Sequence, residues 1–340
     1  MKPQNSQQKL IVILGPTSSG KTGLAQKLCL KFNGFIISAD SRQVYRYMDI
    51  GTGKVDSLDE LKELRNQRQN LFRKHLTDPL DYVIKLNDVN HYMIDVIDPN
   101  EDYNAALYQR DVYNLISNFK FLINSKYKIL NTKYQIPFLV GGTGLYIDAV
   151  ADNWQFPKGE PNLELREQIE RQIETDGLES VWTKLTIVDP ESKTFVQKEN
   201  PRRVARALEY VLSTGQKFSE NRGKGRRQFD VLKIGIDLAR EELYKKIDAR
   251  VGAWLEMGLI DEVRLLHKKH GLSWERLRNF GLDYQVAADY LQGKFKSMDA
   301  MLNRFKWNMH AYARRQMTWF RRDREIKWVS GLKEAEGLVR

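Results

Sequence analysis

One octapeptide near the N-terminus constrains the fold of this chain more than any other feature. Residues 15–22 are Gly-Pro-Thr-Ser-Ser-Gly-Lys-Thr and fit the pattern G-x-x-x-x-G-K-[ST]. The preceding residues 10–14 form a short apolar run rich in β-branched side chains, typical of a parallel strand buried on both faces. Apolar residues follow at helical spacing: Leu24, Ala25, Leu28 and Cys29. Strand, loop and helix therefore occur in the order that a phosphate-binding loop requires.

This loop has the residues needed to bind a di- or triphosphate. Its glycines let the backbone wrap closely around a phosphate, and we expect the amides of residues 18–22 to point inward at the helix N-terminus. Lys21 would neutralise terminal phosphate oxygens, and the Thr22 hydroxyl is placed to bind Mg²⁺. The predicted diphosphate- or nucleotide-binding residues are Gly15, Pro16, Thr17, Ser18, Ser19, Gly20, Lys21 and Thr22.

Further apolar runs predict the other strands of a sheet, at residues 35–37, 92–96, 137–140 and 231–236. Two of these runs lead into loops that contain Asp40, Ser41 and Thr143. Ligands of open parallel sheets bind beyond the carboxyl ends of the strands, so these three residues would line one crevice with the phosphate loop. The predicted fold class is α/β, with a P-loop, nucleotide-kinase-like parallel sheet as its core.

The net charge and the composition limit the kinds of binding partner and site that this chain can have. The 340 residues carry a formal excess of +11 and a pI near 9.4, which suits a polyanionic partner but also serves solubility. A single cysteine, Cys29, excludes an intramolecular disulfide and a cysteine-based metal site. No apolar stretch approaches the ~18 residues of a membrane span. We therefore expect a cytoplasmic protein without membrane contact, and a monomer.

A helical segment interrupts the predicted core. Residues 152–229 show helical patterns, and a strand resumes only at Val231. We predict a core formed by residues 1–151 and 230–340, with C-terminal RNA-binding helices, and a helical insertion domain over 152–229. Asn200 and Pro201 start one helix of this insertion.

Two stretches concentrate the basic charge. In the helix after Asn200, Arg202 and Arg206 fall on the face opposite an apolar stripe, where they are solvated or bind phosphate. Basic residues are also frequent over 301–328, with Trp307 and three further aromatic residues between them: Tyr312, Trp319 and Phe320. Rings beside arginines suit RNA, because unstacked bases lie on the rings while guanidinium groups meet phosphates; the alternative is an amphipathic helix with core aromatics.

Arg250 breaks the pattern of its own helix. The apolar stripe over residues 243–257 contains this arginine in its middle. Because an unpaired buried guanidinium is costly, we expect an anionic partner, either a structural carboxylate or the phosphate ligand.

Three functional classes remain open from the residues alone. A small-molecule kinase would use Asp40 as the base that deprotonates an acceptor hydroxyl. Group transfer onto RNA from a diphosphate-bearing donor would also explain the basic helices. An RNA-binding NTPase module would need hydrolytic machinery, for which Asp95 is a weak candidate.

Several motifs taken together are specific to one family. The chain resembles the tRNA dimethylallyltransferases, also called tRNA isopentenyltransferases, through matches that span most of its length. They are Gly-Pro-Thr-Ser-Ser-Gly-Lys-Thr (15–22), Asp-Ser-Arg-Gln-Val-Tyr (40–45), Met-Asp-Ile-Gly-Thr (48–52), Leu-Val-Gly-Gly-Thr (139–143), Pro-Arg-Arg-Val-Ala-Arg-Ala-Leu (201–208) and Arg-Arg-Gln-Met-Thr-Trp-Phe (314–320).

The resemblance implies transfer of a dimethylallyl group from its diphosphate to N6 of the adenosine at tRNA position 37. Asp40 would accept the amine proton, while Thr143, Arg250, the phosphate loop and Mg²⁺ stabilise the departing diphosphate. The adenosine lies in the anticodon stem-loop and must be extruded to react. The implied tRNA contacts are Asp40, Ser41, Arg42, Gln43, Thr143, Arg166, Arg202, Arg203, Val204, Ala205 and Arg206.

The chain departs from the family pattern in three places. Residues 280–284 are Phe-Gly-Leu-Asp-Tyr where many members have Gly-Tyr followed by a basic residue. Lys246 replaces a common arginine, which weakens a bidentate phosphate contact there. Residues 55–88 are longer than in compact members and predict a helix and a loop that decorate the core.

Overall fold

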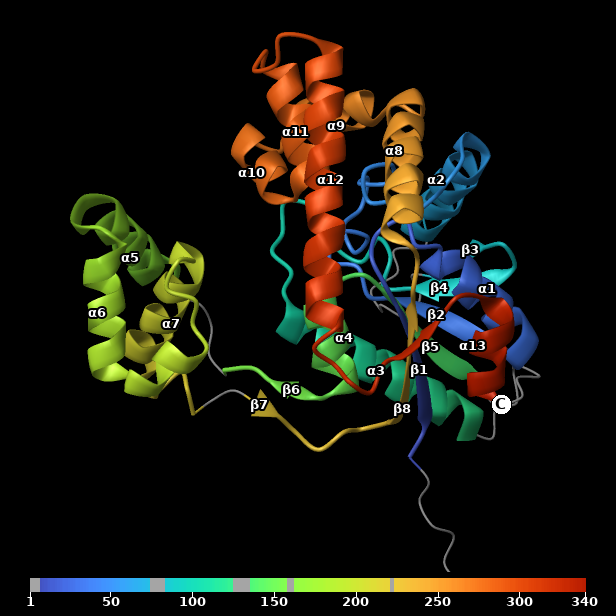
Figure 1. Cartoon of the computed structure of the whole chain (residues 1–340), viewed down its shortest axis with the longest axis horizontal. Coiled ribbons are helices and arrows are strands. Elements are labelled where there is room, and N and C mark those ends of the chain that lie inside the picture. The colour runs from blue at the N-terminus through green and yellow to red at the C-terminus, as the bar shows by residue number, and fades with distance from the viewer. Residues whose placement is uncertain (1–6, 74–82, 125–134, 158–161, 221–222) are drawn as a thin grey trace, which may run out of the picture. The chain divides into compact units, whose positions relative to one another are not determined.

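A mostly parallel sheet forms the centre of the larger part of the chain (Figure 1). The computed structural model describes residues 7–73, 83–124, 135–157, 162–220 and 223–340. The sheet has seven strands in the order β3-β4-β2-β5-β1-β8-β9. Its strands are β1 (Lys9–Leu14), β2 (Gly34–Ser38), β3 (Ile84–Leu86), β4 (Val89–Tyr92), β5 (Ile136–Gly141), β8 (Asp230–Ile236) and β9 (Lys327–Val329). Only β3, at one edge, pairs antiparallel.

The interior strands are the apolar runs of the sequence. β1 pairs in parallel with β5 on one side and with β8 on the other, and its residues 10–14 are at most 1% exposed. This burial on both faces explains the continuous run of branched aliphatic side chains, because a parallel sheet has no solvated face to which polar residues could point. The α/β class and four of the predicted strands are thereby confirmed.

The strand predicted over residues 92–96 is wrong in its position. β4 ends at Tyr92, where its parallel pairing with β2 also stops. The backbone turns immediately afterwards, since Met93 and Asp95 have positive φ angles of 61° and 60°. Met93 and Ile94 are nevertheless buried, so the apolar residues that suggested a strand belong to a buried turn.

Helices cover the sheet. α1 (Lys21–Phe32) packs against β2 and β5, and α13 (Leu332–Val339) packs beside α1. α3 (Ala105–Asn124) packs against α4 (Gly144–Ala151), which also contacts β1 and β5. The ends of β1, β2 and β5 thus lie among helices that fix the loops following them (Figure 1).

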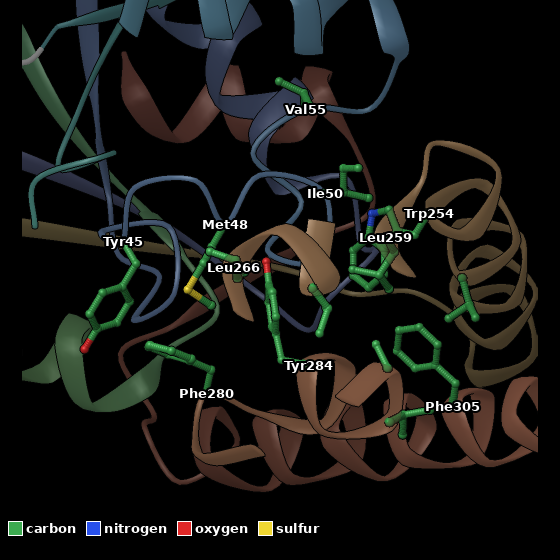
Figure 2. Close-up of a cluster of buried hydrophobic side chains, with 14 of the residues drawn as sticks. Tyr45, Met48, Ile50, Val55, Trp254, Leu259, Leu266, Phe280, Tyr284 and Phe305 are labelled. Atoms are coloured by element: carbon green, nitrogen blue, oxygen red, sulfur yellow. The ribbon is translucent and has the colours of Figure 1, made fainter. Parts of the chain in front are cut away.

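A second group of helices, near the C-terminus of the chain, builds its own hydrophobic core (Figure 2). Its members are α8 (Arg240–Glu256), α9 (Leu259–Lys268), α10 (Trp274–Asn279), α11 (Leu282–Leu291) and α12 (Met298–Phe320). Residues of the loop that follows β2, including Tyr45, Met48 and Ile50, are buried in the same core. The helices therefore hold that loop in place. Among the described residues, no helix is long and apolar enough to cross a bilayer.

The region 55–88, expected as helix and loop, contains α2 (Leu58–Arg73) and the edge strand β3. Residues 74–82 of that prediction lie outside the described residues.

Residues 152–227 form a separate compact unit. Its described residues comprise the short strands β6 (Trp154–Gln155) and β7 (Gly223–Lys224), which pair antiparallel, three helices and a turn of 3-10 helix (Pro190–Thr194). The helices are α5 (Leu163–Asp176), α6 (Leu178–Val188) and α7 (Pro201–Thr214). Asn200 caps α7 by accepting the backbone N–H of Arg203 at 3.2 Å. The sequence placed the second boundary of this unit two residues later, after residue 229.

Candidate active site

The phosphate loop connects β1 to α1 through backbone conformations that its sequence favours. Gly20, immediately before α1, has a φ of 87°, and Ser18 also has a positive φ of 61°. Among the described residues, the side-chain oxygens of Ser18 and Ser19 are buried without a hydrogen-bond partner. Buried hydroxyls are normally paired, so two unpaired ones beside a helix N-terminus suit an anionic ligand with several oxygens.

Lys21 occupies the electrostatic centre of this loop. Its ammonium donates to the carbonyl of Pro16 at 2.7 Å. Burial, together with a smaller effect of the positive charge of Arg250, lowers the pKa of Lys21 to about 7, although the negative charge of Asp40 opposes this shift. Lys21 is therefore close to both of these groups, which belong to other elements of the fold.

Asp40, Ser41 and Thr143 come together at the ends of two neighbouring strands. The Asp40 carboxylate accepts the backbone N–H of Arg42 at 2.9 Å, which fixes its direction. The Thr143 hydroxyl accepts the backbone N–H of Ser41 at 3.1 Å. The close approach depends on Gly141, since a Cβ at that position would lie 2.1 Å from the carbonyl oxygen of Ala39. The sequence-predicted crevice is thus formed by β2 and β5.

Gln316, on α12, connects this crevice to the phosphate loop. Its side-chain oxygen accepts the backbone N–H of Thr17 at 2.8 Å, and its side-chain nitrogen donates to the carbonyl of Gly142 at 2.9 Å. Sequence analysis assigned no role to this residue. One signal was present: Gln316 lies on the buried face of α12 with Met309, Ala313 and Phe320, and a polar side chain on such a face needs partners.

Arg42 and Gln43 make contacts inside the protein. Gln43 accepts a hydrogen bond from Ser38 at 2.7 Å and donates to the carbonyl of Gly53 at 3.1 Å, so its side chain braces the loop after β2. Arg42 donates to the carbonyl of Asn279 at 3.4 Å. Burial raises the pKa of Asp283 to about 6, and the nearby Arg42 guanidinium opposes that rise.

A cavity of about 210 Å³ opens beside Ser41 and Arg42. Four aromatic rings and a second arginine contribute to its walls: Tyr45, Tyr103, Tyr146, Phe280 and Arg276. Tyr45 and Phe280 meet edge to face, with ring centroids 4.8 Å apart (Figure 2). A planar, partly polar group is the kind of ligand that such walls accept.

Arg250 has the carboxylate partner that one of the two sequence-based hypotheses required. Its guanidinium donates to Asp56 at 2.5 Å and lies over the ring of Trp254. The side chain is partly exposed rather than buried in the apolar stripe. Its influence on Lys21 places its charge near the phosphate loop as well. Arg250 could therefore contact both Asp56 and a phosphate bound in the loop.

Asp95 has a structural environment. It is buried, and its two carboxylate oxygens bind Lys54 at 2.6 Å and Arg68 at 2.7 Å. Asp49 binds the same two cations, which makes a buried cluster of two acids and two bases. These ion pairs explain why an aspartate follows β4 and give it a structural role.

Comparisons with known proteins agree with this geometry. The family model described as IPP transferase matches residues 83–323, and the one described as isopentenyl transferase matches residues 8–147. A tRNA dimethylallyltransferase from Halothermothrix orenii is 38% identical over 96% of this chain and 88% of its own. One from Thermomicrobium roseum is 35% identical over 95% of this chain and 87% of its own.

The chain belongs to the IPP transferase family. Among solved structures, the full-length tRNA isopentenylpyrophosphate transferase from Bacillus halodurans is similar, with a TM-score of 0.60, 31% identity and coverage of 95% of this chain and 90% of that one. A eukaryotic dimethylallyltransferase has the same fold, with a TM-score of 0.68 and 22% identity over 97% of this chain and 76% of that one. The resemblance found in the sequence is confirmed, and neither the kinase nor the NTPase alternative is favoured.

In this member of the IPP transferase family, the RNA contacts expected in the unit 152–227 divide into three groups: exposed arginines, buried apolar residues and arginines that pair with a buried acid. Arg202 and Arg203 are exposed on the first turn of α7. Val204 and Ala205 are 0% exposed and form part of the core of the unit, so their assignment to an RNA-binding surface is corrected. Their spacing places them on the apolar face of the helix, which the motif match alone does not reveal.

Arg166 and Arg206 bind the same buried carboxylate, that of Glu209. Arg166 donates to Glu209 at 3.0 Å, and the backbone N–H of Asn162 donates to it at 2.9 Å. Burial raises the pKa of Glu209, but these hydrogen bonds hold it below its usual value. Glu209 was not among the site residues predicted from the sequence, although an acid on the apolar face of α7 is a signal for such a partner.

The residues at which the chain departs from the family pattern make contacts that the structure shows. Tyr284 is buried and donates to Glu262 at 2.7 Å, and Glu262 accepts the backbone N–H groups of Asp49 and Ile50. Lys246 pairs with Glu242 on the surface of α8. The residues that replace the family's Gly-Tyr motif therefore support the loop after β2.

Proposed function

We propose that this protein transfers a dimethylallyl group from dimethylallyl diphosphate to N6 of the adenosine at tRNA position 37. The observation that carries the proposal is a chain of hydrogen bonds between the phosphate loop and the loop that contains Asp40. Gln316 joins Thr17 to Gly142, and the neighbouring Thr143 hydroxyl accepts the backbone N–H of Ser41. A diphosphate held by the loop and an amine held by Asp40 would meet between the two. Membership in the IPP transferase family supports this assignment.

The chemistry divides between the two sides of the crevice. The allylic C–O bond breaks and its electron pair leaves with the diphosphate, while the N6–C bond forms. Asp40 hydrogen-bonds the exocyclic amine, which is a weak nucleophile, and accepts its N6 proton as the N6–C bond forms. Lys21, the loop amides, Thr143 and Arg250 stabilise the charge that accumulates on the diphosphate.

Thr22 fits a role in binding Mg²⁺, the divalent ion that we propose as cofactor. Thr22 is an exposed residue at the first turn of α1, and its hydroxyl is a hard oxygen ligand. Among the described residues, no group of three or more acidic, histidine or cysteine side chains could hold a metal ion. One protein oxygen together with substrate phosphate oxygens is a common Mg²⁺ environment, in which the ion neutralises leaving-group charge.

The RNA substrate is the anticodon stem-loop. The target adenine is extruded from the loop so that Asp40, Ser41 and Thr143 can reach its amine. The exposed Arg202 and Arg203 bind RNA phosphates. We propose that the protein acts as a monomer in the cytoplasm.

A labelled-donor assay tests this function. Purified protein with Mg²⁺ and radiolabelled dimethylallyl diphosphate is expected to label a tRNA with adenosine at position 37. The same tRNA with guanosine there, which has no N6 amine, is the matched control and is expected to stay unlabelled. Transfer of the terminal phosphate of ATP to a small molecule, without prenyl transfer, would show that the kinase alternative is right.

A further inference from the structure

A second pocket lies between α11 and α12, apart from the phosphate loop. Its volume is about 260 Å³, and its walls include Gln285 and Asp289 of α11 and Arg304, Trp307 and Arg315 of α12. This volume is below the usual 300–1,000 Å³ of pockets for drug-sized ligands and suits one flat ring system.

Trp307 is an unusual residue on this surface. The neighbouring apolar residues of α12, such as Phe305 and Met309, are buried, whereas Trp307 is 57% exposed. The Arg304 guanidinium lies over its ring, 4.9 Å from the centroid. An exposed indole that already stacks with a cation forms a platform for a further planar group.

The charges around Trp307 favour an anion. The one acid in the pocket wall, Asp289, accepts hydrogen bonds from Arg278 and Lys294, both at 2.8 Å, and these interactions lower its pKa although burial alone would raise it. Arg304 and Arg315 are exposed, and neither has an ion pair among the described residues. The pocket therefore combines a stacking surface with two cations.

The pocket is also close to the reacting groups. Arg315 lies over the ring of Tyr312, 5.8 Å from its centroid. The next residue of α12 after Arg315 is Gln316, whose side chain hydrogen-bonds the backbone of Thr17 in the phosphate loop and of Gly142 beside Thr143. Arg315 is eight positions after Trp307 on α12, which corresponds to about 12 Å along the helix axis.

We propose that this pocket is a stacking site for an unpaired nucleobase that neighbours the target adenine in the RNA strand. The base stacks on Trp307, and Arg304 and Arg315 bind the adjoining phosphates. Stacking of single-stranded bases on aromatic rings beside arginines is a general mode of RNA binding. The inference rests on the proposed function, because it assumes that the bound polyanion is the tRNA whose adenine reacts at Asp40.

RNA affinity, measured without the prenyl donor, tests this site independently of catalysis. The probe is a fluorescent anticodon stem-loop, and the protein is the full chain. Trp307→Ala is expected to weaken binding about tenfold, within the range for loss of one stacked base, and Trp307→Phe is expected to retain most of the affinity. Leu265→Ala, which removes a similarly exposed apolar side chain from α9, is the matched control and should leave affinity unchanged.

Stem-loops with an abasic nucleotide on either side of the target adenosine identify the stacked base. For one of the two, Trp307→Ala should cause no further loss, because the base that stacks is already missing. The inference is overturned if Trp307→Ala binds the intact stem-loop within twofold of wild type. It is also overturned if the loss is the same for both abasic stem-loops as for the intact one. If wild type binds RNA in this way but transfers no prenyl group, the proposed function fails and the stacking site stands.

Discussion

The side-chain oxygen of Gln316 accepts the backbone N–H of Thr17 at 2.8 Å, which connects the C-terminal helix α12 to the phosphate loop. The same side chain donates to Gly142, one residue before Thr143. A residue 299 positions away in sequence from Thr17 thus determines the spacing between the two sides of the crevice. Gln316 is a positioning residue in this arrangement.

Gln316→Ala is expected to lower kcat by about a hundredfold, because small displacements of reacting groups have effects of that size. It should also lower the free energy of unfolding by about 1–3 kcal/mol, since the part-buried N–H of Thr17 and the buried carbonyl of Gly142 lose this partner. Steady-state kinetics and urea unfolding measure the two effects. Asn303→Ala, at an exposed position of the same helix, should change neither. Unchanged kcat in the Gln316 variant would remove it from the positioning role.

Lys21 predicts a pH dependence of donor binding. Its pKa of about 7 in the free protein means that a large fraction is neutral at pH 8, whereas a bound diphosphate favours the charged form. Donor affinity should therefore decrease as the pH rises through 7, with proton uptake on binding at pH 8.

The contribution of Lys21 to folding stability changes with pH in the opposite direction. The lowered pKa makes the folded state bind fewer protons than the unfolded one, so stability rises with pH between about 7 and the ordinary lysine value.

Isothermal titration calorimetry at pH 8, in buffers of different ionisation enthalpy, measures this proton uptake. Lys21→Met should bind the donor more weakly and take up no proton through this position. Equal proton uptake in wild type and Lys21→Met would contradict the assignment.

The buried cluster around Arg68 predicts a large effect on stability. Among the described residues, Arg68→Ala leaves Lys54 as the one buried cation beside Asp49 and Asp95, with the half-exposed Arg65 3.8 Å from Asp49. Removal of one partner from a buried ion pair costs about 3–5 kcal/mol. Lys62→Ala removes one partner of the exposed pair with Asp59 and should cost less than about 1 kcal/mol. Urea unfolding at neutral pH compares the two. A loss below about 1 kcal/mol for Arg68→Ala would contradict this account.

The arginines of α7 should separate into binding and structural groups. Arg202→Ala and Arg203→Ala are each expected to weaken tRNA binding and to reduce the salt slope by roughly 0.7–0.9, the contribution of one neutralised phosphate. Arg206→Ala should instead mainly lower stability, because it removes a partner of buried Glu209. Fluorescence anisotropy at several salt concentrations and thermal unfolding test both effects. An unchanged salt slope for the first two variants would place them outside the RNA surface.

Sequence reasoning was most successful where a feature is local. The strand over residues 10–14, the phosphate loop and the cap at Asn200 each depend on neighbouring residues, and the structure contains all three. The short strands β3 and β9 were missed because three residues that include a lysine do not form a distinct apolar run.

Contacts between residues far apart in the chain could not be predicted from the sequence. That Arg250 needs an anion followed from helical periodicity, but the identity of Asp56 depends on how α8 packs against the loop after β2. The same holds for Gln316 and for the pairing of Arg166 with Glu209. In each case a polar residue on an apolar face gave the signal, while only the tertiary fold supplies the partner.

The most direct test of the central claim is single-turnover transfer by Asp40→Asn, measured with saturating donor and position-matched tRNA. Asparagine keeps an oxygen that can accept the Arg42 amide but cannot take up a proton at neutral pH. The account predicts that the rate of prenyl transfer falls by at least about a hundredfold, in the range for loss of a general base, while tRNA and donor affinities stay within a few fold. A transfer rate close to wild type in a correctly folded Asp40→Asn protein would contradict it.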